Sequence, residues 1–162
     1  MGGVLSKELQ EELARAANPR HLFGIWDVEA DSGAVRLGHL EIASKDLCLF
    51  LGGSPRAALL AATLGVSADG MLNRLMHSNM AHAALADRLY SRMIEDYVSE
   101  AQAGITAAKK RYSPGYGDFC LSHQKDILAM LGCAKIGLYA TDSFMLVPSK
   151  SITAVFPLGE GL

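Results

Sequence analysis

Apolar positions along the chain recur with two different periods, and these periods predict the elements of secondary structure. Three leucines spaced by four residues lie beside Ser6, which can cap a helix, and an Asn-Pro pair then stops it, so residues 1–18 are predicted to form an N-terminal helix. The bulky apolar run of residues 21–28 and the alternating residues 35–39 predict two strands of a hairpin, because an Asp-Ser-Gly turn lies between them.

The middle of the chain predicts three helices and one buried segment. Ser44 begins a short helix that a Gly-Gly pair ends. Residues 56–65 are continuously apolar, which fits a strand buried on both faces or a buried turn of helix. An amphipathic helix follows, and a long one then runs from Ser78 or Asn79 to about Ala108 with a single apolar stripe.

The last third of the chain predicts one helix and several short strands. Ser122 is expected to cap a helix that Gly132 closes. Three apolar segments, KIGLYA, SFMLV and ITAVF, are predicted as strands, with residues 148–151 as a hairpin loop between the last two. Residues 160–162 are expected to fray. Strands come early and late with helices between them, which predicts an α+β fold with a mostly antiparallel sheet.

Composition narrows the classes of protein. The 162 residues suit one domain, and a net charge of −2 with no basic half argues against a nucleic-acid partner. The longest apolar run spans residues 57–66, whereas a bilayer span needs about twenty residues, and the N-terminus does not resemble a signal peptide, so no membrane association is expected. Three widely spaced cysteines favour a reducing cytoplasm over a disulfide framework.

Common catalytic and metal-binding patterns are not evident. Cys120 and His123 have the spacing of half a zinc site, but no second close pair completes it, so no metal is expected. The sequence has neither a nucleophile elbow nor a phosphate-binding glycine loop. Glu95 and its acidic neighbours on the long predicted helix fit a solvated helix face better than a catalytic pair, so no catalytic residue is assigned.

The segment RYSPGYG, residues 111–117, concentrates unusual backbone chemistry. Its proline fixes φ and extends Ser113, while Gly115 permits a positive φ and close approach of a ligand to bare backbone groups. Arg111 offers a fork of donors for a carboxylate, and Tyr116 adds a flat face and a hydroxyl. Two interpretations stay open: a cradle for a zwitterionic ligand with an aromatic end, and a tight loop that joins two helices.

Several segments together resemble a known family. Residues 111–117 are similar to the Arg-x-(Ala/Ser)-x-Gly-Tyr motif in the activation domain of cobalamin-dependent methionine synthase, which binds S-adenosylmethionine. The likeness covers residues 19–159 and extends to three further segments: LLAATLG, ALADRLYSRMIEDY and TDSFMLVPSKSITAVFPLG. The resemblance implies a twisted antiparallel sheet with flanking helices in a single domain of residues 1–162.

The resemblance also implies a ligand and roles for four residues. Arg111 would meet the methionine carboxylate of S-adenosylmethionine, the backbone of Ser113 and Gly115 would meet the adenosine part, and Tyr116 would flank the ligand on the side that faces a corrinoid. In the family, this domain supports reductive methylation that returns cob(II)alamin to methylcobalamin, with an electron from a flavodoxin-like donor.

Two departures from the family shape the expected function. The chain lacks the corrinoid-binding Asp-x-His-x-x-Gly sequence, so cobalamin would be met only on a partner, either a corrinoid-binding protein or a truncated methionine synthase. Ala83 stands where the family often has a glutamate. The resemblance thus implies an accessory component of a cobalamin-dependent methyltransferase in methionine biosynthesis. The alternatives are a non-catalytic protein that keeps only the docking surface, and an unrelated small-molecule-binding protein.

Overall fold

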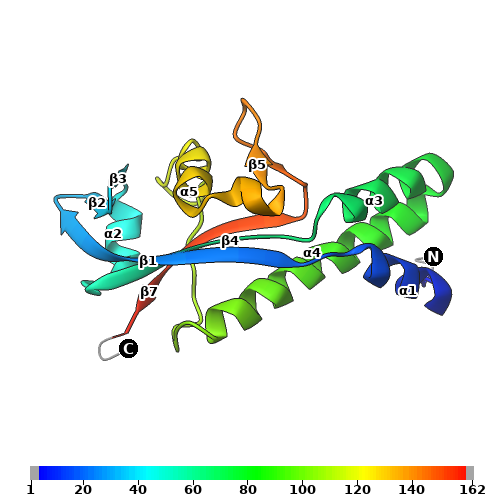
Figure 1. Ribbon diagram of the computed structural model, residues 1–162, viewed down its shortest axis with the longest axis horizontal. Coiled ribbons are helices and arrows are strands. Elements are labelled where there is room, and N and C mark those ends of the chain that lie inside the picture. Colours follow the sequence, from blue (N-terminus) through cyan, green and yellow to red (C-terminus); the bar gives the residue numbers. More distant parts are fainter. Residues whose placement is uncertain (1–3, 160–162) are drawn as a thin grey trace.

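A curled antiparallel sheet lies at the centre of the computed structural model, which describes residues 4–159 (Figure 1). Its strand order is β3-β2-β1-β4-β7, and every neighbouring pair is antiparallel. The strands are β1 (Arg20–Asp31), β2 (Ala34–Leu37), β3 (Leu40–Ala43), β4 (Arg56–Thr63) and β7 (Ser151–Leu158), and β5 (Tyr139–Ala140) pairs separately with β6 (Leu146–Val147). The start of the predicted N-terminal helix (1–3) and the predicted frayed tail (160–162) lie outside the described residues.

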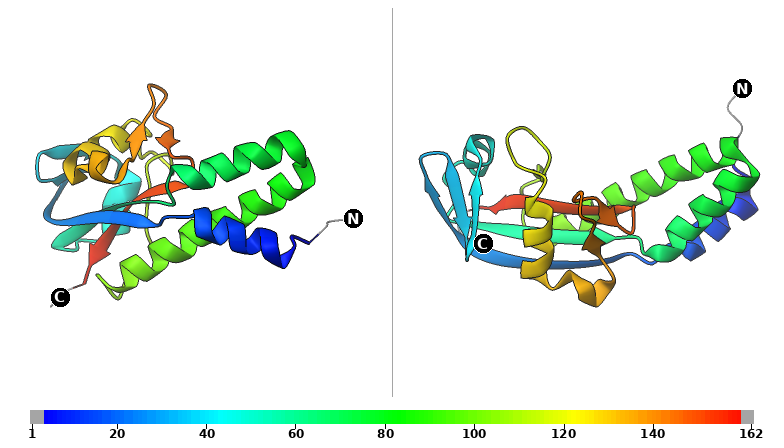
Figure 2. Two further views of the ribbon diagram at one scale, coloured as in Figure 1. Left: turned by 45° about the vertical axis from the view of Figure 1, so that its right-hand side comes forward. Right: turned by 90° about the horizontal axis from the view of Figure 1, so that it is seen from above.

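Helices cover both faces of the sheet, in agreement with the flanking helices that the resemblance implied. They are α1 (Lys7–Ala16), α2 (Lys45–Leu51), α3 (Val66–Ser78), α4 (Met80–Ala103) and α5 (His123–Leu131), with a 3-10 turn at Cys133–Ile136. Helix α3 runs outward to the tip of a helical arm, and α4 runs back beside it and crosses one face of the sheet, while α2 and α5 lie on the other face (Figures 1 and 2). No helix in the described part of the chain has the length and apolar character to cross a membrane.

Strand β4 separates two hydrophobic cores. Ala58 and Leu60 point into a core with α3 and α4, and Leu59 points into a core with α2 and α5. All three side chains are fully buried. The continuous apolar run is therefore a strand covered on both faces, and the alternative of a buried helical turn is excluded.

The predicted helix caps are confirmed in part. Ser44 Oγ accepts from the Leu47 N–H at 2.9 Å, and Asn79 starts α4 by accepting from the His82 N–H at 3.1 Å. Ser122 instead has helical backbone angles and makes no capping bond.

The prediction that the long helix reaches Ala108 is wrong. The helix ends five residues earlier, because the chain leaves the helical path after Gly104.

Three strand predictions are corrected. The alternation over residues 35–39 ends at Leu37, because Gly38 takes φ +60° and turns the chain through His39 into β3. In the segment KIGLYA, Lys135 and Ile136 belong to the 3-10 turn and only Tyr139–Ala140 forms a strand. In the segment SFMLV, only Leu146–Val147 forms a strand.

Residues 148–151 do not join two paired strands. Strand β6 pairs with β5, and β7 pairs with β4, so the predicted hairpin between the last two strands is wrong. Contacts far away in sequence hold this segment: Ser149 bonds to Asp69 on α3 through its N–H (2.8 Å) and Oγ (2.7 Å). Lys150 Nζ lies 2.8 Å from Asp87 on α4. The segment therefore fastens the helical arm to the sheet.

Candidate functional site

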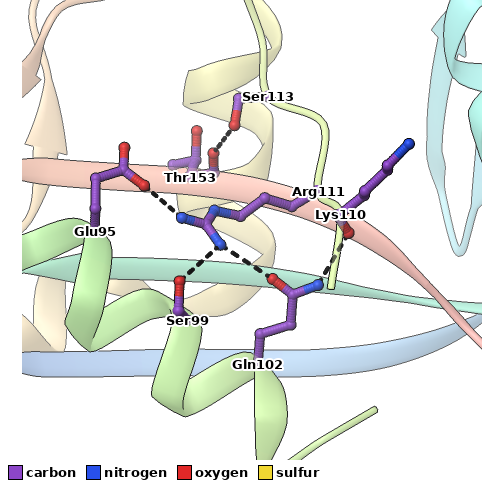
Figure 3. Close-up of polar contacts among 7 residues, drawn as sticks. All are labelled: Glu95, Ser99, Gln102, Lys110, Arg111, Ser113 and Thr153. Atoms are coloured by element: carbon purple, nitrogen blue, oxygen red, sulfur yellow. Dashed lines mark hydrogen bonds and ion pairs between the residues drawn. The ribbon is translucent and has the colours of Figure 1, made fainter. Parts of the chain in front are cut away.

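The segment singled out in the sequence leaves α4 and runs along edge strand β7. The Tyr112 N–H donates to the Val155 carbonyl at 2.9 Å, and the Val155 N–H donates back to the Tyr112 carbonyl at 2.7 Å. One residue on, Ser113 Oγ donates to the Thr153 carbonyl at 2.6 Å (Figure 3). These bonds anchor the turn to the sheet, so the side chains of the turn are held in a fixed position relative to β7.

The bend itself is closed by its own backbone. The Gly115 N–H donates to the Phe119 carbonyl at 2.7 Å, and the Tyr116 N–H donates to the Ser113 carbonyl at 3.1 Å. The positive φ values expected of the glycines are present, at +99° for Gly115 and +50° for Gly117. The expectation of bare N–H groups is not met at Gly115 and Tyr116, because both N–H groups are used within the loop.

Arg111 turns toward α4 and away from bulk solvent. Its Nη1 donates to Ser99 Oγ and to Gln102 Oε1, each at 3.3 Å, and its Nη2 pairs with Glu95 Oε2 (Figure 3). The arginine side chain is 18% exposed, whereas that of Glu95 is 58% exposed. The guanidinium is therefore partly desolvated and lies beside one carboxylate.

This arrangement leaves hydrogen-bonding capacity on Arg111 and Glu95. A guanidinium has five N–H donors, and the three bonds above leave its Nε–H and one Nη2–H without a partner among residues 4–159. Glu95 uses only Oε2 toward the arginine. A carboxylate and an ammonium on one ligand would each find a complementary charge here.

A groove of about 380 Å³ lies over these groups, between α4, the turn and β7. Its lining includes Glu95, Lys109, Arg111, Ser113, Pro114, Tyr116, Gln124, Leu146, Ser151, Ile152 and Thr153. Three of the four predicted site residues thus share one hollow, and Gly115 is not part of its lining. Glu95 belongs to the groove although its sequence context indicated only a solvated face, because nothing local reveals that Arg111 folds back onto it.

The floor of the groove is polar, and its side chains bond to one another and to the backbone. Thr153 Oγ1 donates to Gln124 Oε1 at 2.6 Å, and Gln124 Nε2 donates to the Phe144 carbonyl at 2.9 Å. Thr153 and Gln124 are both buried. Since their polar atoms already have partners, the floor supplies a rigid surface.

Tyr116 stands at the rim of the groove. It is 58% exposed, and its ring meets the Tyr112 ring edge-on with centroids 5.9 Å apart. The Tyr112 ring stacks between Phe50 and Phe119. Burial, followed by the nearby carboxylates Asp46 of α2 and Asp118 of the turn, raises the pKa of the Tyr112 hydroxyl. The aromatic stack therefore supports Tyr116 and leaves its face open to solvent.

The other residues considered from the sequence lie elsewhere. His123 Nδ1 bonds to Asp126 at 3.0 Å, and Cys120 Sγ lies 3.1 Å from Ser122 Oγ. No group of three potential metal ligands occurs among the described residues. Ala83 lines a different hollow of about 510 Å³ between α3 and α4, so the position at which a glutamate was expected does not face the Arg111 groove.

Comparison with known proteins gives a structural likeness. No family model matches the sequence, and no curated protein matches it significantly. Among solved structures, the chain is similar to the crystal structure of the MetH reactivation domain bound to AdoHcy, with a TM-score of 0.65 and 17% sequence identity. The match covers 96% of this chain and 64% of that one. The protein therefore has the α+β fold of the MetH reactivation domain.

Proposed function

We propose that this protein binds S-adenosylmethionine in the groove beside Arg111 and supports reductive methylation of a corrinoid held by a separate protein. The observation that carries the proposal is the position of the Arg111 guanidinium, partly buried against Glu95 with two N–H donors to spare. The likeness to a domain bound to AdoHcy adds support, since that molecule has the same amino acid and nucleoside ends.

The charges at the groove suit the amino acid end of the ligand. The α-carboxylate would take the free donors of Arg111, and the α-ammonium would take the free oxygen of Glu95. Each charge-assisted bond in a partly desolvated site contributes about 1–3 kcal/mol, or about tenfold to a hundredfold in affinity. The adenosine would extend past Ser113 and Pro114 toward Tyr116, whose exposed face can stack on a purine.

The partner would complete the chemistry. S-adenosylmethionine supplies the methyl group, and the corrinoid supplies a cobalt nucleophile after one-electron reduction by a flavodoxin-like donor. This protein would hold the methyl donor and dock on the corrinoid protein, which makes it an accessory component. A cytoplasmic location fits this role.

Isothermal titration with S-adenosylmethionine and S-adenosylhomocysteine tests the proposal. Saturable binding is expected, and Arg111→Ala should weaken it by about a hundredfold. Glu95→Gln keeps the shape of the side chain and should weaken both ligands about tenfold, because the ammonium loses its charged partner.

Arg36→Ala is the matched control for the arginine variant. Arg36 also lies near two carboxylates, Glu29 at 3.7 Å and Glu41 at 3.5 Å, but on the exposed β1–β3 surface. Its loss should leave both affinities unchanged. Equal weakening by Arg36→Ala and Arg111→Ala would contradict a specific site at the groove.

One observation favours a second function, that of a non-catalytic docking protein. Glu95 already balances the charge of Arg111, so the guanidinium has a counter-ion without a ligand. This alternative predicts no binding of either compound at millimolar concentration together with capture of a cob(II)-state corrinoid protein. Absence of both binding and capture would contradict both functions.

A further inference from the structure

Gln102 is a buried polar residue in the last turn of α4, with only 2% of its surface exposed. Burying an amide is unfavourable unless its donors and acceptor find partners. A glutamine near a helix end normally reaches solvent. Its burial here therefore calls for a physical reason.

The Gln102 amide joins the helix to the chain that carries Arg111. Its Nε2 donates to the carbonyls of Ala108 and Lys110, both at 2.9 Å, and its Oε1 accepts from Arg111 Nη1 at 3.3 Å. Figure 3 shows the amide between the Lys110 backbone and the guanidinium. Both N–H groups and the oxygen are thus used.

This pattern allows a single orientation of the amide. Exchanging its oxygen and nitrogen would place Nε2 donors against the donors of Arg111, and Oε1 against the carbonyls of Ala108 and Lys110. The carbonyls therefore fix the direction in which Oε1 points. Oε1 in turn fixes the position of Arg111 Nη1, because that nitrogen donates to Oε1 and also to Ser99 Oγ.

We infer that Gln102 is a positioning residue that presets the Arg111 guanidinium for a ligand carboxylate. The ligand part of this inference rests on the proposed function. With Nη1 held by Gln102 and Ser99, the plane of the fork is set before a ligand arrives, so less side-chain freedom is lost on binding. Gln102 need not touch the ligand to act this way.

The first experiment uses the ligand-free protein. Gln102→Met keeps length and burial but removes all three hydrogen bonds. NMR relaxation of the Arg111 Nε–H group should show a clear fall in its order parameter in Gln102→Met relative to wild type. Gln10→Met, on α1 and far from the groove, is the matched control and should leave it unchanged. An unchanged Arg111 signal in Gln102→Met overturns the inference.

The second experiment separates positioning from a general structural effect. S-adenosylhomocysteine carries a carboxylate, and 5′-methylthioadenosine lacks the whole amino acid end. Gln102→Met should weaken the first about tenfold and leave the second unchanged, because only the first uses Arg111. In an Arg111→Ala background, Gln102→Met should have no further effect. Equal weakening of both compounds, or additive effects with Arg111→Ala, overturns the inference.

The two experiments also separate this inference from the proposed function. A wild-type protein that binds neither compound contradicts the proposed function and the ligand part of the inference. Ordering of Arg111 by Gln102 in the relaxation measurement would still support the positioning itself.

Discussion

Asp118 and Asp46 bond to each other reciprocally across 72 positions of sequence. The Asp118 N–H donates to Asp46 Oδ2 at 3.0 Å, and the Asp46 N–H donates to Asp118 Oδ1 at 3.3 Å. Asp118 also accepts from the Lys45 N–H at 2.9 Å and from the Ser44 hydroxyl. The carboxylate of Asp118, which directly follows the turn of residues 111–117, thus binds the N-terminus of α2, where a negative charge is favoured.

This contact predicts a loss of stability in acid. The Ser44 hydroxyl, and then the backbone N–H groups of Lys45 and Asp46, hold the pKa of Asp118 below its usual range. The folded state therefore binds the proton less well than the unfolded state, so the contribution is present at neutral pH and is lost as the pH falls through the folded-state pKa. Asp118→Asn should lower the urea midpoint at pH 7 and have little effect at the acid end. A difference between wild type and variant that is independent of pH would contradict this assignment.

Gly117 occupies a position that disfavours a larger residue for two reasons. Its φ is +50°, and an added Cβ would collide with Asp46 Oδ2 and Tyr112 Oη. Gly53 is a matched control, because it has φ +79° but no atom within 4 Å of the added Cβ. Gly53→Ala should cost about 1–2 kcal/mol from backbone strain. Gly117→Ala should cost clearly more, and the two free energies of unfolding give the comparison. Equal losses would show that Asp46 and Tyr112 move aside easily.

Local signals in the sequence predicted much of the fold. Ser44 and Asn79 cap their helices through bonds to residues three positions away, and Gly132 closes α5 with φ +65°. The apolar run that became β4 revealed a buried segment by its composition, while the choice between a strand and a buried helical turn needed the structure. Such features depend on neighbours in sequence, which a pattern can reveal.

The structure differs from the predictions where contacts between residues far apart in sequence determine the conformation. Residues 148–151 have the composition of a hairpin loop, but Asp69, 80 positions from Ser149, holds them instead. At the groove, the motif predicted an arginine fork for a carboxylate beside a bend. The partners of Arg111, Glu95 and Gln102, depend on how the irregular chain after α4 folds back, and no local pattern encodes that path.

Tyr90 links α4 to α1 in the interior. It is fully buried, and its hydroxyl donates to the Leu13 carbonyl at 2.7 Å. Tyr90→Phe leaves that carbonyl without the bond and should lower the free energy of unfolding by about 1–2 kcal/mol. Burial raises the pKa of Tyr90 to about 12. This contribution is present below the unfolded-state pKa and is lost as the pH rises toward 12. Between neutral pH and strongly alkaline pH, the free energy of unfolding from urea titrations should therefore fall less for Tyr90→Phe than for wild type. An equal fall in both proteins would contradict the assignment.

Lys150 is expected to fasten the helical arm to the sheet. Its Nζ lies 2.8 Å from Asp87 Oδ1 and 2.8 Å from Ser91 Oγ, and its side chain is mostly buried. Lys150→Met keeps the apolar stem but leaves Asp87 unpaired. Because Asp87 is partly solvated, the loss should be about 1–2 kcal/mol, below that of a fully buried pair. Hydrogen exchange should also quicken along α3 and the first half of α4 more than in the sheet.

Lys125→Met provides the matched control for the Lys150 variant. Lys125 lies 3.8 Å from Asp142 in an exposed pair, which contributes little in water. Its removal should change the free energy of unfolding by less than about 0.5 kcal/mol and leave exchange in α3 unaltered. If Lys150→Met behaved like Lys125→Met in both measurements, the bonds between Asp69 and Ser149 would be the polar contact that fastens the arm, beside its apolar packing on the sheet. The double variant Lys150→Met/Ser149→Ala would then be the one to release it, since Ser149 Oγ donates to Asp69 at 2.7 Å.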